Sequence, residues 1–328
     1  MDEASPSEGI SQPQPDAVRE EPRRLRRLDI VGRRNWYFLI SLVIIIPGMI
    51  SMITHGFLLG IDFAGGTQYT LVFQHQANLQ QVETAVAQVA GPQGTVQQTT
   101  TGTYIIRTPS AEPVQQAAFK QQLAQKVGPI DDSKSSTSAV GASVAQSIVT
   151  GALGAVVLAS VLILLYLAFR FRKVPGGWRS GLQFGGSALL ALLHDVFLLT
   201  GIYSILGRVL NLHIGEINSL FLTAALTVVG FSVHDTIVVF DRIRENLQTA
   251  RNLTFDQVAN LSIMQTLDRS IITSFTVVLV LLALLLFGGE TIRGFVLALL
   301  IGIVSGVYSS IFNATPLLVV WRRLQPVR

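Results

Sequence analysis

The feature that most constrains the fold of this chain is a series of long apolar stretches with almost no charge. We expect membrane-spanning helices at 36–59, 144–169, 182–206, 217–240, 270–287 and 294–321, because about 20 apolar residues are needed to cross the hydrocarbon core. Only 13% of the residues are charged, whereas about 25% is usual in soluble domains. The pattern excludes a soluble cytosolic enzyme and predicts a polytopic α-helical membrane protein with six transmembrane helices.

Basic residues gather on one predicted side of the membrane. Of the 24 lysines and arginines, 18 lie before the first span, between spans two and three, between spans four and five, or after the sixth. Cytoplasmic segments of membrane proteins carry such an excess, so both termini are predicted to be cytoplasmic. This distribution accounts for the pI near 9.6 without any nucleic-acid partner.

The segment 60–142, between the first two spans, is predicted to form an extracytoplasmic α+β domain. It contains strand patterns at 68–73, 95–100 and 104–108 and helix patterns at 79–90 and 113–127. This β-α-β-β-α order is most of a ferredoxin-like unit, and 133–138 is a candidate for the last strand. The domain holds no cluster of catalytic residues, so binding or mechanical work fits it better than chemistry.

The other parts of the chain follow from these boundaries. Residues 1–22 are polar and rich in Pro, Ser and Glu, so they are predicted to be a disordered cytoplasmic tail. A basic segment and the first helix occupy 23–59, helices two to six occupy 143–321, and 322–328 is a cytoplasmic C-terminal tail.

Ionisable side chains inside the predicted spans point to a functional site. The third span holds His194 and Asp195, the fourth holds His234 and Asp235, and Arg269 lies at the start of the fifth. A charged residue at the centre of a membrane helix costs about 2.5–3.5 kcal/mol on insertion scales, so each needs an explanation. In one hypothesis Asp235 binds and releases a proton, while Arg269 favours its ionised form and desolvation opposes it. For His194, His234 and Asp195 the alternative is hydrogen bonding that locks the helices together.

An intramembrane metal hydrolase built on the two His–Asp pairs is a weaker hypothesis. Imidazole and carboxylate groups are suitable metal ligands, but no HExxH motif accompanies them. The absence of cysteine excludes thiol nucleophiles and cysteine-bound metals, and no P-loop or dinucleotide-binding motif is present. We therefore expect no metal, no other cofactor and no enzymatic activity.

Two patterns concern the faces of the spans. The fourth span and the fifth span each carry polar or small residues along one face. On the fourth span these are Ser219, Thr223, Thr227, Gly230 and His234, and on the fifth they are Arg269, Thr273 and Thr276. The sixth span carries a seam of small residues that allows close helix contact, formed by Ala298, Gly302, Gly306 and Ser310.

Four segments carry a resemblance to a known family. They are GIDFAGGT at 60–67, LHDV at 193–196, VHDTIVVFDRIREN at 233–246 and QTLDRSIITS at 265–274. Together they resemble the signature segments of the SecF family, the smaller subunit of the SecDF protein-export complex, which is related to the RND transporters. The resemblance covers 33–321, and the segment at 233–246 is long and specific.

The resemblance implies partners, a location and a mechanism. SecF proteins form a heterodimer with a SecD-like chain and act with the SecYEG channel, and a YajC-like subunit is a further expected partner. They use the proton-motive force to help draw unfolded polypeptide across the membrane, so protons, polypeptide and membrane lipid are expected partners too. The implied location is the bacterial plasma (inner) membrane, or a thylakoid membrane where the source has one.

The resemblance also implies roles for residues of the predicted relay. The proton-relay aspartate of the family falls on Asp235 and its essential arginine on Arg269, and we include His234 and Asp195 in the predicted relay. The second key aspartate of the family belongs to the SecD half. Many relatives have Asn in place of His234, so a direct part for His234 in the relay is a hypothesis.

A second family motif lies where the first span meets the predicted domain. Asp62, Gly65, Gly66 and Thr67 match it, and glycine permits the positive φ that a tight joint needs. We predict a hinge at this motif.

A second function is compatible with the same sequence. In this alternative the chain is a non-conducting subunit that assembles or stabilises the translocon.

Overall fold

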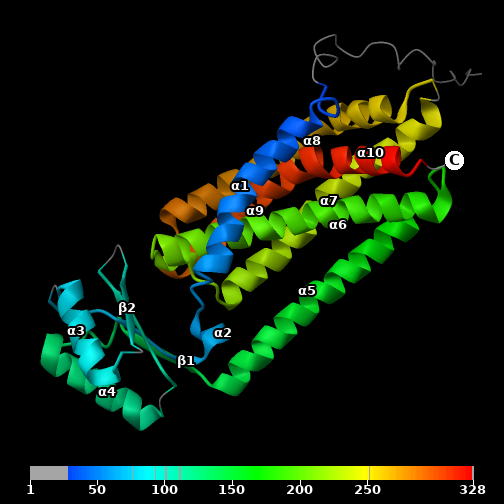
Figure 1. Ribbon diagram of the computed structural model, residues 1–328. Helices are drawn as coiled ribbons and strands as arrows, with labels where there is room; N and C mark the ends of the chain where they lie inside the picture. Colours follow the sequence, from blue (N-terminus) through cyan, green and yellow to red (C-terminus); the bar gives the residue numbers. More distant parts are fainter. Residues whose placement is uncertain are drawn as a thin grey trace, which may run out of the picture.

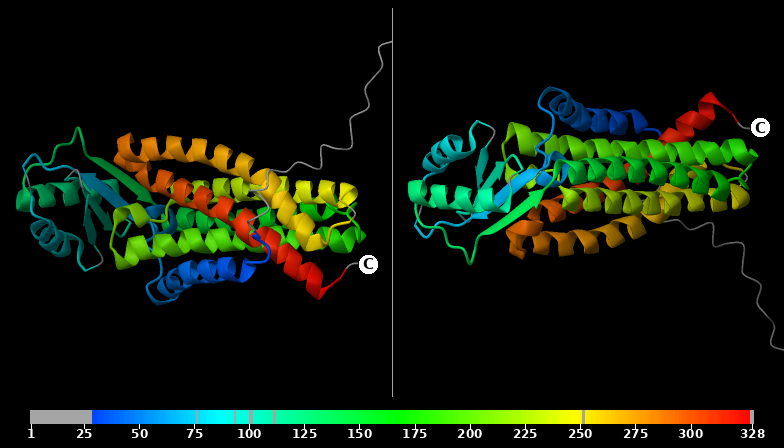
Figure 2. Two further views of the ribbon diagram at one scale, coloured as in Figure 1. Left: turned by 90° about the horizontal axis from the view of Figure 1, so that it is seen from above. Right: turned by 90° about the horizontal axis from the view of Figure 1, so that it is seen from below.

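The computed structural model describes residues 29–75, 77–92, 94–99, 102–110, 112–250 and 252–326. The predicted disordered tail at 1–22 lies outside these residues. A helical bundle makes up most of the molecule, and a small α/β domain lies at one end of it (Figure 1). In both views of Figure 2 the domain and the C-terminus lie at opposite ends of an elongated molecule.

Within the described residues, six helical segments are long and apolar enough to cross a membrane, which confirms the six predicted spans. They are α1 (Arg34–Thr54), α5 (Ala142–Arg170), α6 (Gly177–Ser204) with η3 (Ile205–Val209), α7 (Ser219–Thr249), α8 (Phe255–Phe287), and α9 (Glu290–Ser309) continued by η5 (Ser310–Ala314) and α10 (Thr315–Leu324). A short turn, η4 (His213–Gly215), precedes α7.

Two helices extend the furthest beyond the spans predicted for them. The fourth was expected to end at 240 and the fifth to begin at 270, but α7 continues to Thr249 and α8 begins at Phe255. The backbone hydrogen bonds of a helix form whether its side chains are polar or apolar, so a helix need not end where its apolar stretch ends. A capping box between Thr254 and Gln257 starts α8, and it satisfies backbone N–H groups that the first helical turn leaves open.

Small residues set the closest helix contacts. A Cβ atom on Gly48 of α1 would lie 2.8 Å from the Cα of Gly201 in α6. Gly302 of α9 packs against the side chain of Val228 in α7, and a Cβ atom on Gly306 would lie 3.1 Å from the Cβ of Ser232. The predicted small-residue seam of the sixth span therefore faces α7.

Helix α5 differs from the others in how little of it is covered. It runs from the domain to the far end of the bundle, where it turns into α6 (Figure 1). Its buried residues are Ala145 near its start and Leu167 and Ala168 near its end. The apolar surface between them is open to lipid or to another chain.

The α/β domain is a single sheet with two helices on one face. Its elements are α2 (Ile61–Ala64), β1 (Gly66–Leu71), α3 (Leu79–Ala90), β2 (Thr95–Gln98), β3 (Tyr104–Thr108), α4 (Pro113–Val127) and β4 (Ser136–Val140). All strand pairs are antiparallel, in the order β2-β3-β1-β4. The last strand, for which the sequence offered only a candidate segment at 133–138, is β4 and begins at Ser136. Tyr69, Leu71, Tyr104 and Ile106 pack with α3 and α4 to form the core.

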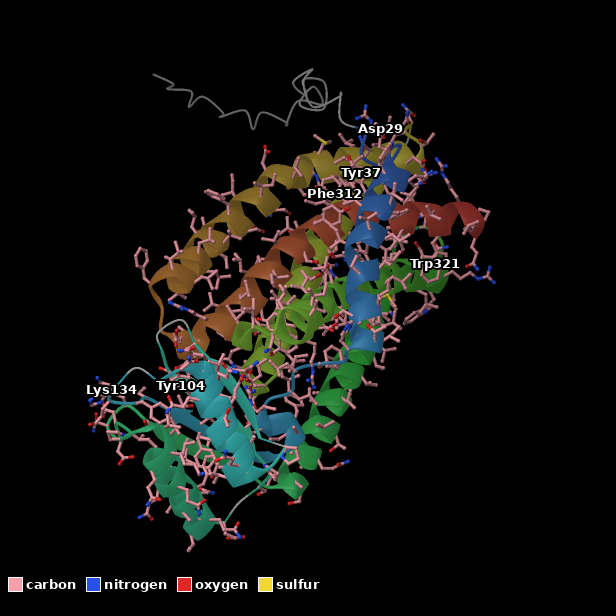
Figure 3. All side chains as sticks on the ribbon, turned by 60° about the vertical axis from the view of Figure 1, so that its left-hand side comes forward. Asp29, Tyr37, Tyr104, Lys134, Phe312 and Trp321 are labelled. Atoms are coloured by element: carbon pink, nitrogen blue, oxygen red, sulfur yellow. The ribbon has the colours of Figure 1, made fainter. Side chains whose placement is uncertain are left out.

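The two ends of the described chain lie together. In Figure 3, Asp29, Tyr37, Phe312 and Trp321 lie at the end of the bundle away from the domain residues Tyr104 and Lys134. Such an arrangement is what an even number of crossings produces, as the six predicted spans require.

Candidate functional site

The first buried carboxylate of the bundle is Asp195 on α6, which is fully buried. Its oxygens accept hydrogen bonds from the hydroxyls of Ser232 on α7 at 2.7 Å and of Ser305 and Ser309 on α9, both at 2.6 Å. His194 Nδ1 lies 3.1 Å from the same carboxylate. Asp195 therefore joins three helices at one point.

The second buried carboxylate is Asp235 on α7. Ser270 of α8 donates a hydrogen bond to its Oδ1 at 2.5 Å, and Ser310 at the start of η5 donates to its Oδ2. The oxygens of a carboxylate can accept about four hydrogen bonds when ionised, and two acceptor positions are occupied in this way. Asp235 thus sits beside two serine hydroxyls within an apolar bundle.

Consecutive residues on one segment bind the two carboxylates. Ser309 ends α9 and contacts Asp195, whereas Ser310 begins the π-helical turn η5 and contacts Asp235. A π-turn widens the helix and rotates the residues that follow it, and such turns are frequent at functional sites. The Ser309–Ser310 backbone therefore links the surroundings of the two carboxylates directly.

Sequence reasoning missed most of these serines. It named Ser310 only as a packing residue and did not use Ser232, Ser305 or Ser309. Serine in membrane helices often bonds to a carbonyl of its own helix, so its presence in a span does not reveal a partner. The only available signal is the i, i+4 spacing of Ser305 and Ser309, which places them on one face.

The other members of the predicted relay lie elsewhere. His234 and Arg269 are exposed on the side of the bundle, and among the described residues no ion pair joins Arg269 to Asp235. The residue that reaches Asp235 is Ser270, one position further along α8. Arg269 points in another direction, because successive helical residues point about 100° apart.

The two polar stripes predicted for spans four and five are exposed on α7 and α8. The exposed residues are Ser219, Thr223, Thr227, Gly230, His234, Arg269, Thr273 and Thr276. The described residues contain no group of three or more His, Asp or Glu side chains that could hold a metal ion.

The predicted hinge joins α1 to the domain and also touches α7. Gly65 and Gly66 have φ values of 72° and 119°, which glycine adopts far more readily than other residues. The Asp62 carboxylate accepts hydrogen bonds from the backbone N–H of Ser219 at 2.9 Å and from its hydroxyl at 2.5 Å. Asp62 therefore fixes the hinge segment to the first residue of α7.

Replacing Gly66 by alanine is expected to destabilise the domain by about 1–3 kcal/mol, the usual penalty for a strained backbone. A Cβ atom there would lie 2.6 Å from the carbonyl oxygen of Thr108, on the paired strand β3. Gly141→Ala is the matched control, because Gly141 has a negative φ and nothing within 4 Å of its Cβ position. Thermal unfolding of the two variants should differ clearly, and equal melting temperatures would contradict this account of Gly66.

Comparison with known families identifies two regions of the chain. The family described as protein export membrane protein SecD/SecF, C-terminal, matches residues 119–324. The SecD/SecF GG motif matches residues 50–77, which include Asp62, Gly65 and Gly66.

Individual relatives extend the similarity to most of the chain. The protein translocase subunit SecF of Thermobaculum terrenum is 46% identical over an alignment of 307 residues, and the match covers 90% of this chain and 94% of that protein. The protein translocase subunit SecDF of Bacillus subtilis is 31% identical over 90% of this chain and 38% of its own. The crystal structure of SecDF, a translocon-associated membrane protein from Thermus thermophilus, matches with a TM-score of 0.76 at 32% identity. This match covers 90% of the chain and 39% of the SecDF chain, so the chain spans less than half of that protein.

Proposed function

The chain belongs to the SecD/SecF family of protein export membrane proteins, and we propose that it is a SecF-type subunit that couples proton movement to polypeptide export. Asp235 is the proposed proton carrier. The observation that supports this role is its position, buried within an apolar bundle and hydrogen-bonded to the hydroxyls of Ser270 and Ser310. Serine hydroxyls can both donate and accept, so they accommodate the ionised and the protonated carboxyl group alike.

The relay is completed by a SecD-type partner in this proposal. Fused SecDF relatives contain about twice the length of this chain or more, which supports a second, SecD-like half as the partner. The exposed polar face with His234 and Arg269 is the surface on which this half would pack, because polar groups facing lipid are unfavourable. Arg269 would then act across the interface. Asp195, held by three serines, contributes chiefly to helix packing.

We further propose that the α/β domain is a ferredoxin-like domain on the extracytoplasmic side, with both termini in the cytoplasm. The excess of basic residues at the other end of the bundle supports this orientation. The host is the bacterial plasma (inner) membrane. Partners there are the SecYEG channel, a YajC-like subunit and the polypeptide in transit, and movement of the domain is the mechanical output.

Asp235→Asn tests the proposal. Export of a secreted reporter is measured in cells depleted of their own SecDF and supplied with this chain and its SecD partner. The variant should lose the part of export that depends on membrane potential, because moving one charge across 100 mV supplies about 2.3 kcal/mol and Asn does not titrate. Asp132→Asn, an exposed position in the domain, is the matched control and should export normally.

Normal export by Asp235→Asn would contradict the transport proposal. The chain would then be an assembly or packing subunit, which is the alternative function. Copurification of the SecD partner with Asp235→Asn must be verified in the same cells, so that loss of export is not loss of the complex.

A further inference from the structure

The sheet of the α/β domain has a polar face that is turned away from α3 and α4. Because side chains alternate along a strand and cross-strand partners share a face, the register places Gln97, Ile105, Arg107 and Gln68 together on it. Gln97 and Arg107 contact the segment between η3 and α7, where Gln97 donates to Asn211 at 3.3 Å. This face therefore docks on the end of the bundle.

Arg107 is the centre of the docked face. Its Nε donates to Gln68 at 3.3 Å and its Nη1 to Gln97 at 3.1 Å, so both neighbouring strands orient it. Its Nη2 forms an ion pair with Glu216 and lies 3.2 Å from His213 Nδ1. Burial lowers the pKa of the Arg107 guanidinium, and the carboxylate of Glu216 opposes that effect.

Glu216 belongs to the segment from which α7 begins. It is buried, and His213 Nδ1 lies 2.9 Å from the same carboxylate oxygen that pairs with Arg107. The next residue, Ile217, donates its backbone N–H to Leu58 at 2.8 Å and accepts from Gly60 at 2.9 Å. Glu216 thus lies three residues before Ser219, where α7 starts.

We propose that the Arg107–Glu216 pair is a latch that holds the sheet of the α/β domain on the start of α7, so that movement of α7 moves the domain. The same helix carries Asp235, so this inference rests on the proposed proton-driven function. Asp62 holds the linker to Ser219, whereas the latch holds the sheet. With the latch open, the sheet can turn about Gly65 and Gly66 while the linker stays attached.

The latch is testable because removing one partner of a buried charge pair leaves the other unpaired. Spin labels are placed on Gln121→Cys, exposed on α4, and Leu210→Cys, exposed on the bundle; the chain has no cysteine of its own. The full chain is reconstituted with a cysteine-free SecD partner, and the label–label distance distribution is measured. Glu216→Gln should lower the docked-to-undocked ratio by at least about tenfold.

Two further variants make the result specific. Glu83→Gln, an exposed position on α3, removes one negative charge from the α/β domain outside the latch and should leave the distribution unchanged. The double variant Arg107→Glu with Glu216→Arg restores an opposite-charge pair, and the amides of Gln68 and Gln97 can turn to donate to the new carboxylate. It should recover most of the docked population and most of the potential-dependent export that Glu216→Gln loses.

The outcomes separate the latch from the proposed function. An unchanged distance distribution in Glu216→Gln overturns the latch, as does full potential-dependent export by a chain whose domain has undocked. If Asp235→Asn exports normally while Glu216→Gln undocks the domain, the docking contact stands and the proton-driven function fails. Loss of docking and of export together, both recovered in the charge-reversed pair, supports the latch.

Discussion

Asp195→Leu is expected to lower the stability of the bundle by about 2–5 kcal/mol, because three serine hydroxyls lose their acceptor at once and each interhelical hydrogen bond in a membrane contributes about 0.6–1.7 kcal/mol. These donors come from α7 and α9 and meet on α6. Leucine has the same branching at Cγ and the same number of side-chain heavy atoms as aspartate, so the substitution leaves no cavity. The measurement is the temperature at which the detergent-solubilised complex loses its monodisperse peak in size-exclusion chromatography.

Asp195→Asn separates hydrogen bonding from charge. Its amide keeps one oxygen that can accept from Ser305 or from the other serines, so the melting temperature should fall by less than in Asp195→Leu. Potential-dependent export by Asp195→Asn should stay near normal, in contrast to Asp235→Asn. If instead Asp195→Asn abolishes export without a loss of stability, Asp195 is a member of the relay and its role is not chiefly packing.

Gly302→Leu is expected to prevent α7 and α9 from packing, with a loss of about 3 kcal/mol or more from overpacking. Even a Cβ atom at this position would overlap the side chain of Val228. Val228 is fully enclosed and β-branched, so in a helix it has essentially one χ1 rotamer and cannot turn away. The two helices would have to separate, and the serines of α7 and α9 could then no longer all reach Asp195 on α6. Steady-state amounts of chain and copurified SecD partner in membranes measure the effect.

Gly154→Leu is the matched control for Gly302→Leu. It lies in α5, has nothing within 4 Å of its Cβ position and is exposed. Replacing glycine within a helix favours the helix by about 1 kcal/mol, so the amount of this variant should equal or exceed that of the unmodified chain. If Gly302→Leu accumulates as well as Gly154→Leu, α7 and α9 do not pack as closely as described.

The number and order of the membrane helices could be predicted from the sequence because apolar length is a local property of the chain. The helix ends were less well predicted. The apolar stretch of the fifth span begins just after Arg269, so hydropathy places the start of the helix there, whereas α8 begins at Phe255. The capping box at Thr254 and Gln257 was a readable local signal for this boundary. Beyond it, Val258 and Ile263 bury an amphipathic face against the bundle.

Which polar residues meet was not predictable in the same way. Asp195 and Asp235 stood out because charge is costly in a membrane, and both are buried. Their partners are serines, however, which carry no comparable penalty and so leave no signal in the sequence. The docking of Arg107 on Glu216 joins residues 109 positions apart, from a domain and a loop whose relative placement no local pattern specifies.

The sequence alone determined six spans, the inserted domain, the order of most of its strands and helices, and the two aspartates that require an explanation. Hydrophobic length, strand and helix periodicity and the penalty for buried charge all act over short stretches of chain, so they can be read locally. Only the tertiary structure decided that Ser270 rather than Arg269 reaches Asp235, and that Arg107 closes on Glu216. Those contacts depend on how each helix is rotated about its axis and on how the small residues Gly48, Gly302 and Gly306 let neighbouring helices approach, which are properties of the packed bundle as a whole.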